Sequence, residues 1–247
     1  MVEKELIIFD LDGTLTPSRS PIERETRDLF LELLERKKVA VISGSDFTQF
    51  DEQLLSHLPT TTNVGNLYLL PTSGTRLLTW RDYKWKQQYA EDLSVKERQM
   101  ILQAVTCVLG NNGYTDIGLE HGPAVFDRGS QITFSGLPIN APLSEKLTWD
   151  PDHTKRKAMV AELQEKIPGY QITIGGTSSI DITKQGIDKA YGIKKIMAYT
   201  HVEPEKILFV GDALFPEGND FPATKAGVEC RRVASTADTR ALIKELL

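Results

Sequence analysis

Residues 6–16 read LIIFDLDGTLT, and this stretch determines how the rest of the chain is interpreted. An apolar run, typical of a buried parallel strand, ends in two carboxylates, Asp10 and Asp12, that are separated by one residue. Because side chains alternate faces along a strand, the two acids can converge only if the backbone turns near Asp10, and Gly13 permits that turn. Open α/β sheets bind ligands at the carboxyl ends of their strands. The stretch therefore predicts a ligand site at a sheet edge.

Two acids at such a position admit two interpretations. Buried carboxylates need a compensating charge, and Mg²⁺ is usually held by one or two carboxylates together with substrate phosphate. Asp and Gly are also common turn residues, so a plain surface turn after a strand would explain the same residues. The rest of the chain has to decide between a metal site at Asp10 and Asp12 and a turn without function.

Length and composition describe an ordinary globular chain. Its 247 residues are 40% hydrophobic and 26% charged, which suits one large domain or two unequal ones. The formal net charge of -5 argues against a nucleic-acid surface and requires a local cluster of cations or amides for any anionic substrate. Cys107 and Cys230 have no metal-binding spacing and are expected to be reduced core thiols. The charged start, MVEKE, predicts a cytoplasmic protein without a signal peptide, membrane span or membrane partner.

A second strand end carries hydroxyls instead of carboxylates. Residues 39–42 form a short apolar run, and the Ser43-Gly44-Ser45 segment follows it before a helical pattern that continues to residue 58. Hydroxyls and flexible backbone at the start of a helix can bind an anion through amides and the helix dipole. Plain helix capping by Ser45 or Asp46 is the alternative, and it is compatible with phosphate binding.

Two later segments also place charged residues at the ends of expected elements. Lys189 falls in the first turn of a helix expected over residues 188–199, where a cation opposes the helix dipole unless it serves an anion. A merely tolerated surface lysine is the alternative, and with either interpretation the side chain of Lys189 is expected to be partly exposed. A further buried strand over residues 206–212 ends in Asp212, and Asp220 follows near the start of the next helix. A second pair of acids at a strand end argues against coincidental turns.

The middle of the chain has a different pattern. Alternating polar and apolar positions predict antiparallel, half-exposed strands, with helices expected over residues 94–109 and 154–166. Strands, then a helix, then strands without βαβ order describe an α+β insert. We therefore predict an α/β core of residues 1–81 and 186–247, with a cap of residues 82–185 inserted into it.

Four of the segments described above, at residues 9–16, 43–46, 189 and 211–220, resemble in this order the four motifs of the haloacid dehalogenase (HAD) superfamily of phosphotransferases. Within it the chain is similar to subfamily IIB and its branch of eukaryotic-type phosphomannomutases. The segments that carry the closer resemblance are LTPSR at 15–19, GSD at 44–46, GGTSSIDI at 175–182, GIDK at 186–189, GD at 211–212 and GNDF at 218–221. The resemblance implies an α/β fold with a Rossmann-like parallel-sheet core and an inserted α+β cap of the C2 type.

The resemblance also implies catalytic roles. In this family the first acid of the first motif attacks phosphorus and the second handles the proton, which correspond to Asp10 and Asp12. Mg²⁺ would be held by Asp10, Asp212 and the backbone carbonyl of Asp12. Asp220 would support the metal or Lys189, and Lys189 would neutralise the transferring phosphate.

Residues that bind the substrate follow from the same resemblance. The Ser43-Gly44-Ser45 segment is expected to hold the remaining phosphate oxygens, and Arg19 is a further candidate for substrate binding. Ser179 and Asp181 match positions that contact sugar hydroxyls in the mutases. The alternative for these two is that they are polar residues on an exposed strand face.

One region departs from the family. The mutases carry paired cap arginines that hold the distal phosphate of the sugar, whereas this chain reads DRGS at 127–130 and SGLPINA at 135–141, with Asp127 and Pro138 at the arginine positions. The second arginine is absent, and the first survives only if Arg128 is shifted by one place. A mutase must hold a bisphosphate intermediate and therefore needs a cationic site for its second phosphate. We therefore expect a Mg²⁺-dependent phosphatase that acts on a small phosphomonoester, a sugar phosphate, through an aspartyl-phosphate. The alternative is a phosphomannomutase that interconverts mannose 1-phosphate and mannose 6-phosphate.

The cap helix and the chemistry each admit one more interpretation. The HTKRK segment at 153–157 could supply substitute cations, but a solvated helix face is the expected interpretation. A non-catalytic phosphosugar sensor would keep the fold, yet it would not need a nucleophile. The expected partner is a small phosphorylated molecule, and the chain is expected to be a monomer or a homodimer.

Overall fold

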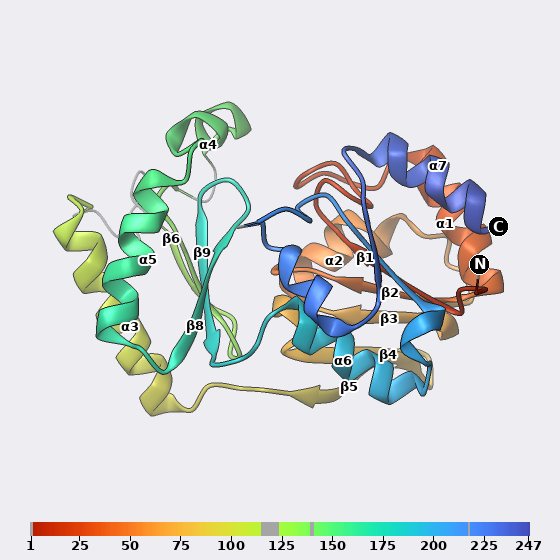
Figure 1. Ribbon diagram of the computed structural model, residues 1–247, viewed down its shortest axis with the longest axis horizontal. Coiled ribbons are helices and arrows are strands. Elements are labelled where there is room, and N and C mark those ends of the chain that lie inside the picture. Colours follow the sequence, from red (N-terminus) through yellow and green to blue (C-terminus); the bar gives the residue numbers. More distant parts are fainter. Residues whose placement is uncertain (1, 115–123, 139–140, 217) are drawn as a thin grey trace. The chain divides into compact units, whose positions relative to one another are not determined.

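The computed structural model describes residues 2–114, 124–138, 141–216 and 218–247 (Figure 1). Residues 139–140, part of the SGLPINA segment, lie outside this range. The chain forms two compact units, which are Met1–Ala90 with Ile187–Leu247 (unit 1) and Glu91–Gly186 (unit 2). The first boundary thus falls after Ala90 and not after residue 81, because the strand that ends at Ala90 pairs with its neighbour in the sheet of unit 1.

Unit 1 is built on a seven-stranded sheet in the order β11-β10-β1-β2-β3-β4-β5. Its strands are β1 (Leu6–Asp10), β2 (Lys38–Ile42), β3 (Leu67–Leu70), β4 (Arg76–Arg81), β5 (Lys84–Ala90), β10 (Ile207–Gly211) and β11 (Glu229–Arg232). Strands β11 to β3 run parallel, and β4 and β5 add an antiparallel edge. The carboxyl end of β1 therefore lies between those of β2 and β10, which confirms the predicted parallel-sheet core.

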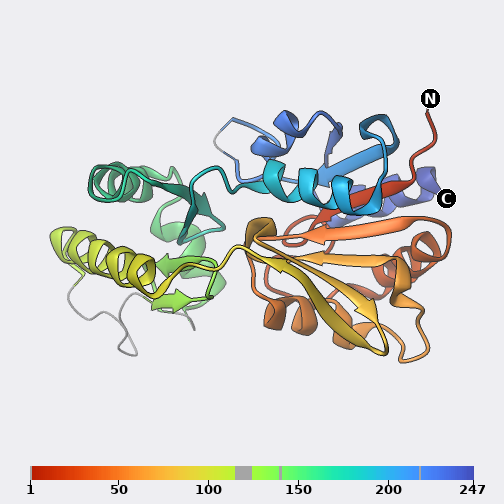
Figure 2. The same cartoon turned by 90° about the horizontal axis from the view of Figure 1, so that it is seen from below.

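Helices cover both faces of this sheet (Figure 2). They are α1 (Arg24–Arg36), α2 (Phe47–Gln53), α6 (Lys189–Thr200) and α7 (Thr236–Leu246), with 3₁₀ turns η1 (Leu55–His57), η2 (Val64–Asn66), η3 (Thr72–Gly74), η4 (Pro204–Lys206) and η5 (Phe221–Ala226). Ile7 and Phe9 pack with α1, α2 and α7, while Leu6 and Ile8 pack with α6 and η5. Strand β1 is apolar up to Asp10 because both of its faces are buried.

Among its described residues, unit 2 has a four-stranded antiparallel sheet in the order β6-β7-β9-β8. Its elements are α3 (Val95–Asn111), β6 (Ala124–Asp127), β7 (Ile132–Ser135), α4 (Leu143–Trp149), α5 (Thr154–Lys166), β8 (Tyr170–Gly175) and β9 (Ser179–Lys184). Ile132, Phe134, Ile180 and Ile182 pack with α3 and α5 on one face of the sheet (Figure 1). The alternate positions are polar, as expected for a sheet with one face in the core.

Some expectations for individual side chains are wrong. Cys107 is exposed and Cys230 is half-buried, so neither is a fully buried core thiol, and burial raises the pKa of Cys230 to about 11. Arg156 is only 1% exposed and forms an ion pair with Asp150, so it does not belong to a solvated helix face. Among the described helices, none combines the length and hydrophobicity that a membrane span requires.

Candidate active site

The chain turns sharply where β1 ends, as the sequence predicts. Asp10 is 3% exposed, and the backbone of Thr16 returns to donate to the Leu11 carbonyl at 2.9 Å. Gly13 has a φ of +81°, and a Cβ at this position would stand 2.7 Å from Asp212 Oδ2. Glycine is therefore needed both for the turn and for the close approach of this loop to Asp212.

The second acid of the motif is held by two donors. The backbone N–H of Arg19 donates to Asp12 Oδ1 at 2.7 Å, and Ser45 Oγ donates to Asp12 Oδ2 at 3.5 Å. The Arg19 side chain itself is exposed, so the backbone of this residue, and not its guanidinium, reaches the motif. These contacts orient the Asp12 carboxylate toward the loop that follows β2.

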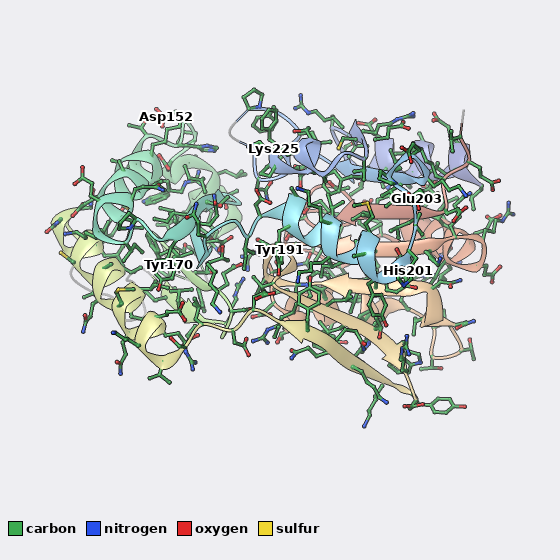
Figure 3. The ribbon with its side chains drawn as sticks, turned by 60° about the horizontal axis from the view of Figure 1, so that its bottom comes forward. Asp152, Tyr170, Tyr191, His201, Glu203 and Lys225 are labelled. Carbon is green, nitrogen blue, oxygen red and sulfur yellow. The ribbon has the colours of Figure 1, made fainter. Side chains whose placement is uncertain are left out.

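Lys189 lies at the start of α6 and is buried. Asp188 caps this helix by accepting from the backbone of Tyr191 at 3.0 Å, and Tyr191 is labelled in Figure 3 at the first turn. Lys189 is 3% exposed, and its Nζ donates to Asp10 Oδ1 at 2.5 Å and also to Asp220 Oδ1. The expectation of a partly exposed lysine is therefore wrong. A first-turn lysine is tolerated here because two carboxylates bind its ammonium.

The end of β10 supplies the remaining acids. Asp212 follows Gly211 directly, and Thr14 Oγ1 lies 3.4 Å from its Oδ1. Asp220 is fully buried, and its Oδ2 accepts from the backbone N–H of Ala213 at 3.0 Å. A Cβ on Gly211 would stand 2.3 Å from Asp220 Oδ2, so a larger residue would displace this acid.

The carboxylates form one cluster with an excess of negative charge. One oxygen each of Asp10, Asp212 and Asp220 lies within 4.8 Å of the others. Three carboxylates around the single ammonium of Lys189 leave a net charge of −2 when all are ionised (three minus one). Burial raises the pKa of Asp10 well above its ordinary value, although Lys189 opposes this. Burial also raises the pKa of Asp212.

Lys189 stays protonated in this cluster. Burial by itself lowers the pKa of a lysine, but the charges of Asp10 and Asp220 raise that of Lys189 above its usual value. The uncompensated charge is thus carried by the acids. Hard carboxylate oxygens that carry a net charge of −2 when ionised fit a divalent cation such as Mg²⁺. Both oxygens of Asp220 already accept from protein donors, which favours a supporting role for this acid beside Asp10 and Asp212.

The Ser43-Gly44-Ser45 segment follows β2, the neighbour of β1. Ser43 and Ser45 are buried, and the Ser45 N–H donates to Ser43 Oγ at 3.1 Å. The N-cap of α2 is Asp46, which accepts from Gln49 at 3.3 Å. Capping is therefore the task of Asp46, and the Ser45 hydroxyl is left to face Asp12. Helix α2 ends at Gln53, well before the predicted residue 58.

The backbone after β3 holds this segment in place through contacts that the sequence does not reveal. The N–H of Thr72 donates to the Ser45 carbonyl and the N–H of Ser73 to the Ser43 carbonyl, both at 2.8 Å. Thr72 and Ser73 both have positive φ values, 51° and 59°, which is rare for a β-branched threonine. The available signal was the position of a TSGT turn at the end of the third parallel strand.

The other candidate residues belong to unit 2. Ser179 and Asp181 both lie on β9, where each is half-buried. Thr133 of β7 donates to Asp181 Oδ1 at 2.7 Å, and Ser135 is the register partner of Ser179. Ser179 and Asp181 therefore lie on the polar face of this sheet, each beside its register partner on β7. The catalytic candidates, by contrast, are all in unit 1.

Gly13→Ala should weaken Mg²⁺ binding. The added Cβ would displace Asp212 and would also strain a backbone at φ +81°, which costs about 1–2 kcal/mol for a non-glycine residue. Gly227→Ala is the matched control, because Gly227 has a φ of +82° and open space around the added atom. Titration calorimetry with Mg²⁺ should show reduced affinity only for the Gly13 variant. Equal affinities in both variants would contradict the assignment of Asp212 to the metal.

Comparison with known proteins agrees with this geometry. A model of the family described as eukaryotic phosphomannomutase matches residues 26–247. The chain is similar to phosphomannomutase 1 of Dictyostelium discoideum, with 29% identity over 100% of this chain and 98% of the relative. It is also similar to the phosphomannomutase of Galdieria sulphuraria, with 29% identity over 87% of this chain and 83% of the relative.

Solved structures share the fold. A haloacid dehalogenase-like hydrolase from Bacteroides thetaiotaomicron superposes with a TM-score of 0.66 at 15% identity, over 99% of this chain and 100% of that one. An IMP-nucleotidase of Plasmodium falciparum superposes with a TM-score of 0.72 at 17% identity, over 99% of this chain and 68% of that one. The family match extends over most of the chain and includes Lys189, Asp212 and Asp220. This chain belongs to the eukaryotic phosphomannomutase family.

Proposed function

We propose that the protein transfers the phosphoryl group of a hexose phosphate to Asp10 and acts as a phosphomannomutase. The observation that carries the phosphoryl-transfer step is the buried contact of Asp10 with Lys189, beside Asp212 and Asp220. A binding protein would gain nothing from a nucleophile beside a fixed ammonium. Membership of the phosphomannomutase family supports the mutase over the phosphatase expected from the sequence.

Mg²⁺ held by Asp10, Asp212 and the Asp12 backbone carbonyl would lower the repulsion between the nucleophile and a phosphate dianion. The Asp10 carboxylate forms a new bond to phosphorus as the bond from phosphorus to the sugar oxygen breaks. Asp12 donates a proton to that leaving oxygen. Lys189 and the Ser43-Gly44-Ser45 segment offset the charge on the remaining phosphate oxygens.

The acceptor then determines the product. Asp12 takes the proton from an attacking hydroxyl, which restores its starting state, and the phosphoryl group leaves Asp10. When the hydroxyl belongs to a hexose phosphate, the product is a hexose bisphosphate, which returns its other phosphoryl group to Asp10 and leaves as the isomeric monophosphate, as a mutase requires. When it belongs to water, the result is inorganic phosphate. In either case we propose that Ser179 and Asp181 bind hydroxyls of the sugar.

A phosphatase is the second candidate, because of two residues in unit 2. Asp127 stands at one arginine position of the mutases and forms an ion pair with Arg98 at 3.4 Å. Its carboxylate provides no positive charge for the distal phosphate of a substrate. Pro138, at the other position, has no side-chain donor. Each missing charge-assisted contact would cost about 1.5–3 kcal/mol of binding to a second phosphate. Water would then compete better for the aspartyl-phosphate.

Phosphorus NMR separates the two candidates. The sample contains the protein, Mg²⁺, mannose 1-phosphate and a catalytic amount of hexose 1,6-bisphosphate. We expect mannose 6-phosphate to appear faster than inorganic phosphate, because the family assignment predicts that the bisphosphate is retained. Phosphate release that outruns isomerisation would replace the mutase by the phosphatase and would point to Asp127 and Pro138 as the cause.

A further inference from the structure

Arg156 of α5 is a buried cation with no part in the chemistry described above. Its side chain is 1% exposed, and its Nε donates to Asp150 Oδ2 at 2.8 Å. Its Nη2 donates to the Asp150 carbonyl at 3.1 Å. Its Nη1 donates to the carbonyls of Gly175 and Gly176, at 3.2 Å and 2.9 Å. The guanidinium therefore joins the start of α5 to the end of β8.

Asp150 completes this junction from the other side. Its carboxylate accepts from the backbone N–H groups of Lys155 at 2.9 Å and Arg156 at 3.1 Å, so it also satisfies donors in the first turn of α5. Figure 3 labels Asp152, just before α5, and Tyr170, at the start of β8, which locate the two elements that are joined. The fork is rigid, because each guanidinium nitrogen has a protein acceptor.

The two carbonyls that Arg156 binds open the turn from β8 to β9. Gly176 has a φ of +45°, and a Cβ on Gly175 would stand 2.8 Å from Asp181 Oδ2. The turn therefore lies directly against the carboxylate proposed to bind the sugar. On the far side of the turn, Ser178 Oγ contacts Ser135 Oγ at 2.9 Å. The hairpin is thus held on its β8 side by Arg156 and on its β9 side by β7.

We propose that Arg156 is a positioning residue for sugar recognition, which it serves by fixing the β8–β9 turn and with it Ser179 and Asp181. This inference rests on the proposed function. It assigns to Arg156 a role beyond its ion pair with Asp150, because that ion pair alone would not need the acceptors of Gly175 and Gly176. The contacts to Gly175 and Gly176 set the path of the turn, and a compact ammonium cannot reproduce that fork.

Two substitutions separate positioning from stability. Arg156→Lys keeps the charge but loses the fork to the two carbonyls. Asp150→Asn removes the ion pair but leaves Arg156 able to bind Gly175 and Gly176. Lys157→Ala, at an exposed position of the same helix, is the control for changes without effect on the turn. Each variant is assayed below its melting temperature with mannose 1-phosphate and with acetyl phosphate, a phosphoryl donor that has no sugar hydroxyls.

For Arg156→Lys we expect a rise of about tenfold or more in KM for mannose 1-phosphate, the scale of one lost charge-assisted hydrogen bond, and unchanged turnover of acetyl phosphate. Asp150→Asn should leave both KM values unchanged even where it lowers the melting temperature. Hydrogen exchange should show faster exchange of the Thr177–Ser179 amides only in Arg156→Lys, a readout that does not depend on the substrate.

Three results would overturn the inference. An equal loss of turnover with mannose 1-phosphate and with acetyl phosphate would show a general structural role. Equal KM changes in the Arg156 and Asp150 variants would show the same. Unchanged KM and unchanged exchange in Arg156→Lys would show that the fork is not needed. Failure of the proposed function is seen separately, because the unmodified protein would then consume acetyl phosphate without turning over any hexose phosphate.

Discussion

Asp10→Asn should abolish turnover of every phosphomonoester and leave the fold intact. The amide cannot attack phosphorus, and its loss of charge also removes the proposed Mg²⁺ ligand, so we expect a fall of about 10⁴-fold or more in kcat. Burial raises the pKa of Asp10, which means that folding opposes its ionised form. The neutral amide should therefore keep or raise the free energy of unfolding, while Lys189 retains Asp220 as its partner.

Steady-state phosphate release and denaturant unfolding measure the two effects. Asp51→Asn, at an exposed position of α2, is the matched control and should change neither. Substantial activity of a pure Asp10→Asn preparation would show that the first motif has been misinterpreted. Loss of activity together with loss of the fold would leave Asp10 a structural residue.

Lys189→Met should lower both activity and stability. Loss of a preorganised charge at the transferring phosphate costs about 10²–10³-fold in kcat. The lysine is 3% exposed between Asp10 and Asp220, so its removal leaves uncompensated buried carboxylates. Breaking a buried ion pair in this way costs about 3–5 kcal/mol. Lys194→Met, exposed on the same helix, should change neither quantity.

The pH dependence of Lys189→Met should have a definite sign. Burial raises the pKa values of Asp10 and Asp212 in the folded state above those of the unfolded chain. Such groups contribute stability at acidic pH, and this contribution is lost as the pH rises through the folded-state pKa. The variant should therefore lose less stability at mildly acidic pH than at neutral pH. A loss of stability in Lys189→Met that grows on acidification would contradict the buried carboxylate cluster. An unchanged kcat of this variant would make Lys189 purely structural.

The strand ends could be predicted from the sequence because their constraints are local. An apolar run that stops at Asp10 or Asp212 identifies a buried strand and its polar end in one pattern. Parallel order then brings the ends of β1, β2 and β10 to one edge, although Asp10 and Lys189 are 179 residues apart. The catalytic candidates can therefore be predicted from the amino-acid sequence and from the parallel order of the strands.

The burial of Lys189 and Arg156 could not be predicted, because it depends on partners that are distant in the sequence or that the helical pattern does not indicate. Lys189 is buried by Asp10 and Asp220, and its place in the first turn of a helix indicates an anion but neither these partners nor the burial. Arg156 sits in a charged stretch that is typical of a solvated helix, and only the Gly175–Gly176 carbonyls and Asp150 explain its burial. The boundary at Ala90 differs from the predicted residue 81 for a similar reason, because antiparallel pairing of β5 with β4 extends the core sheet.

The choice between mutase and phosphatase depends on a different property. Both candidate activities begin with the same proposed transfer to Asp10, so the core motifs do not determine which molecule accepts the phosphoryl group. Asp127 and Pro138 favour water, whereas similarity over the whole chain favours a second sugar phosphate. Retention of a bisphosphate is a property of the cap as a whole, and two positions of a motif do not determine it.

The phosphoenzyme itself gives the most direct test of phosphoryl transfer to Asp10. Rapid acid quench of the protein with acetyl phosphate and Mg²⁺, followed by mass spectrometry of its peptides, locates the transferred group. Asp12→Asn should increase the yield, because loss of the proton acceptor slows dephosphorylation. We predict one phosphoryl group on the peptide that contains Asp10, and none in Asp10→Asn. A phosphoryl group on another residue, or phosphate release without any labelled peptide in Asp12→Asn, would contradict the assignment of Asp10 as the nucleophile.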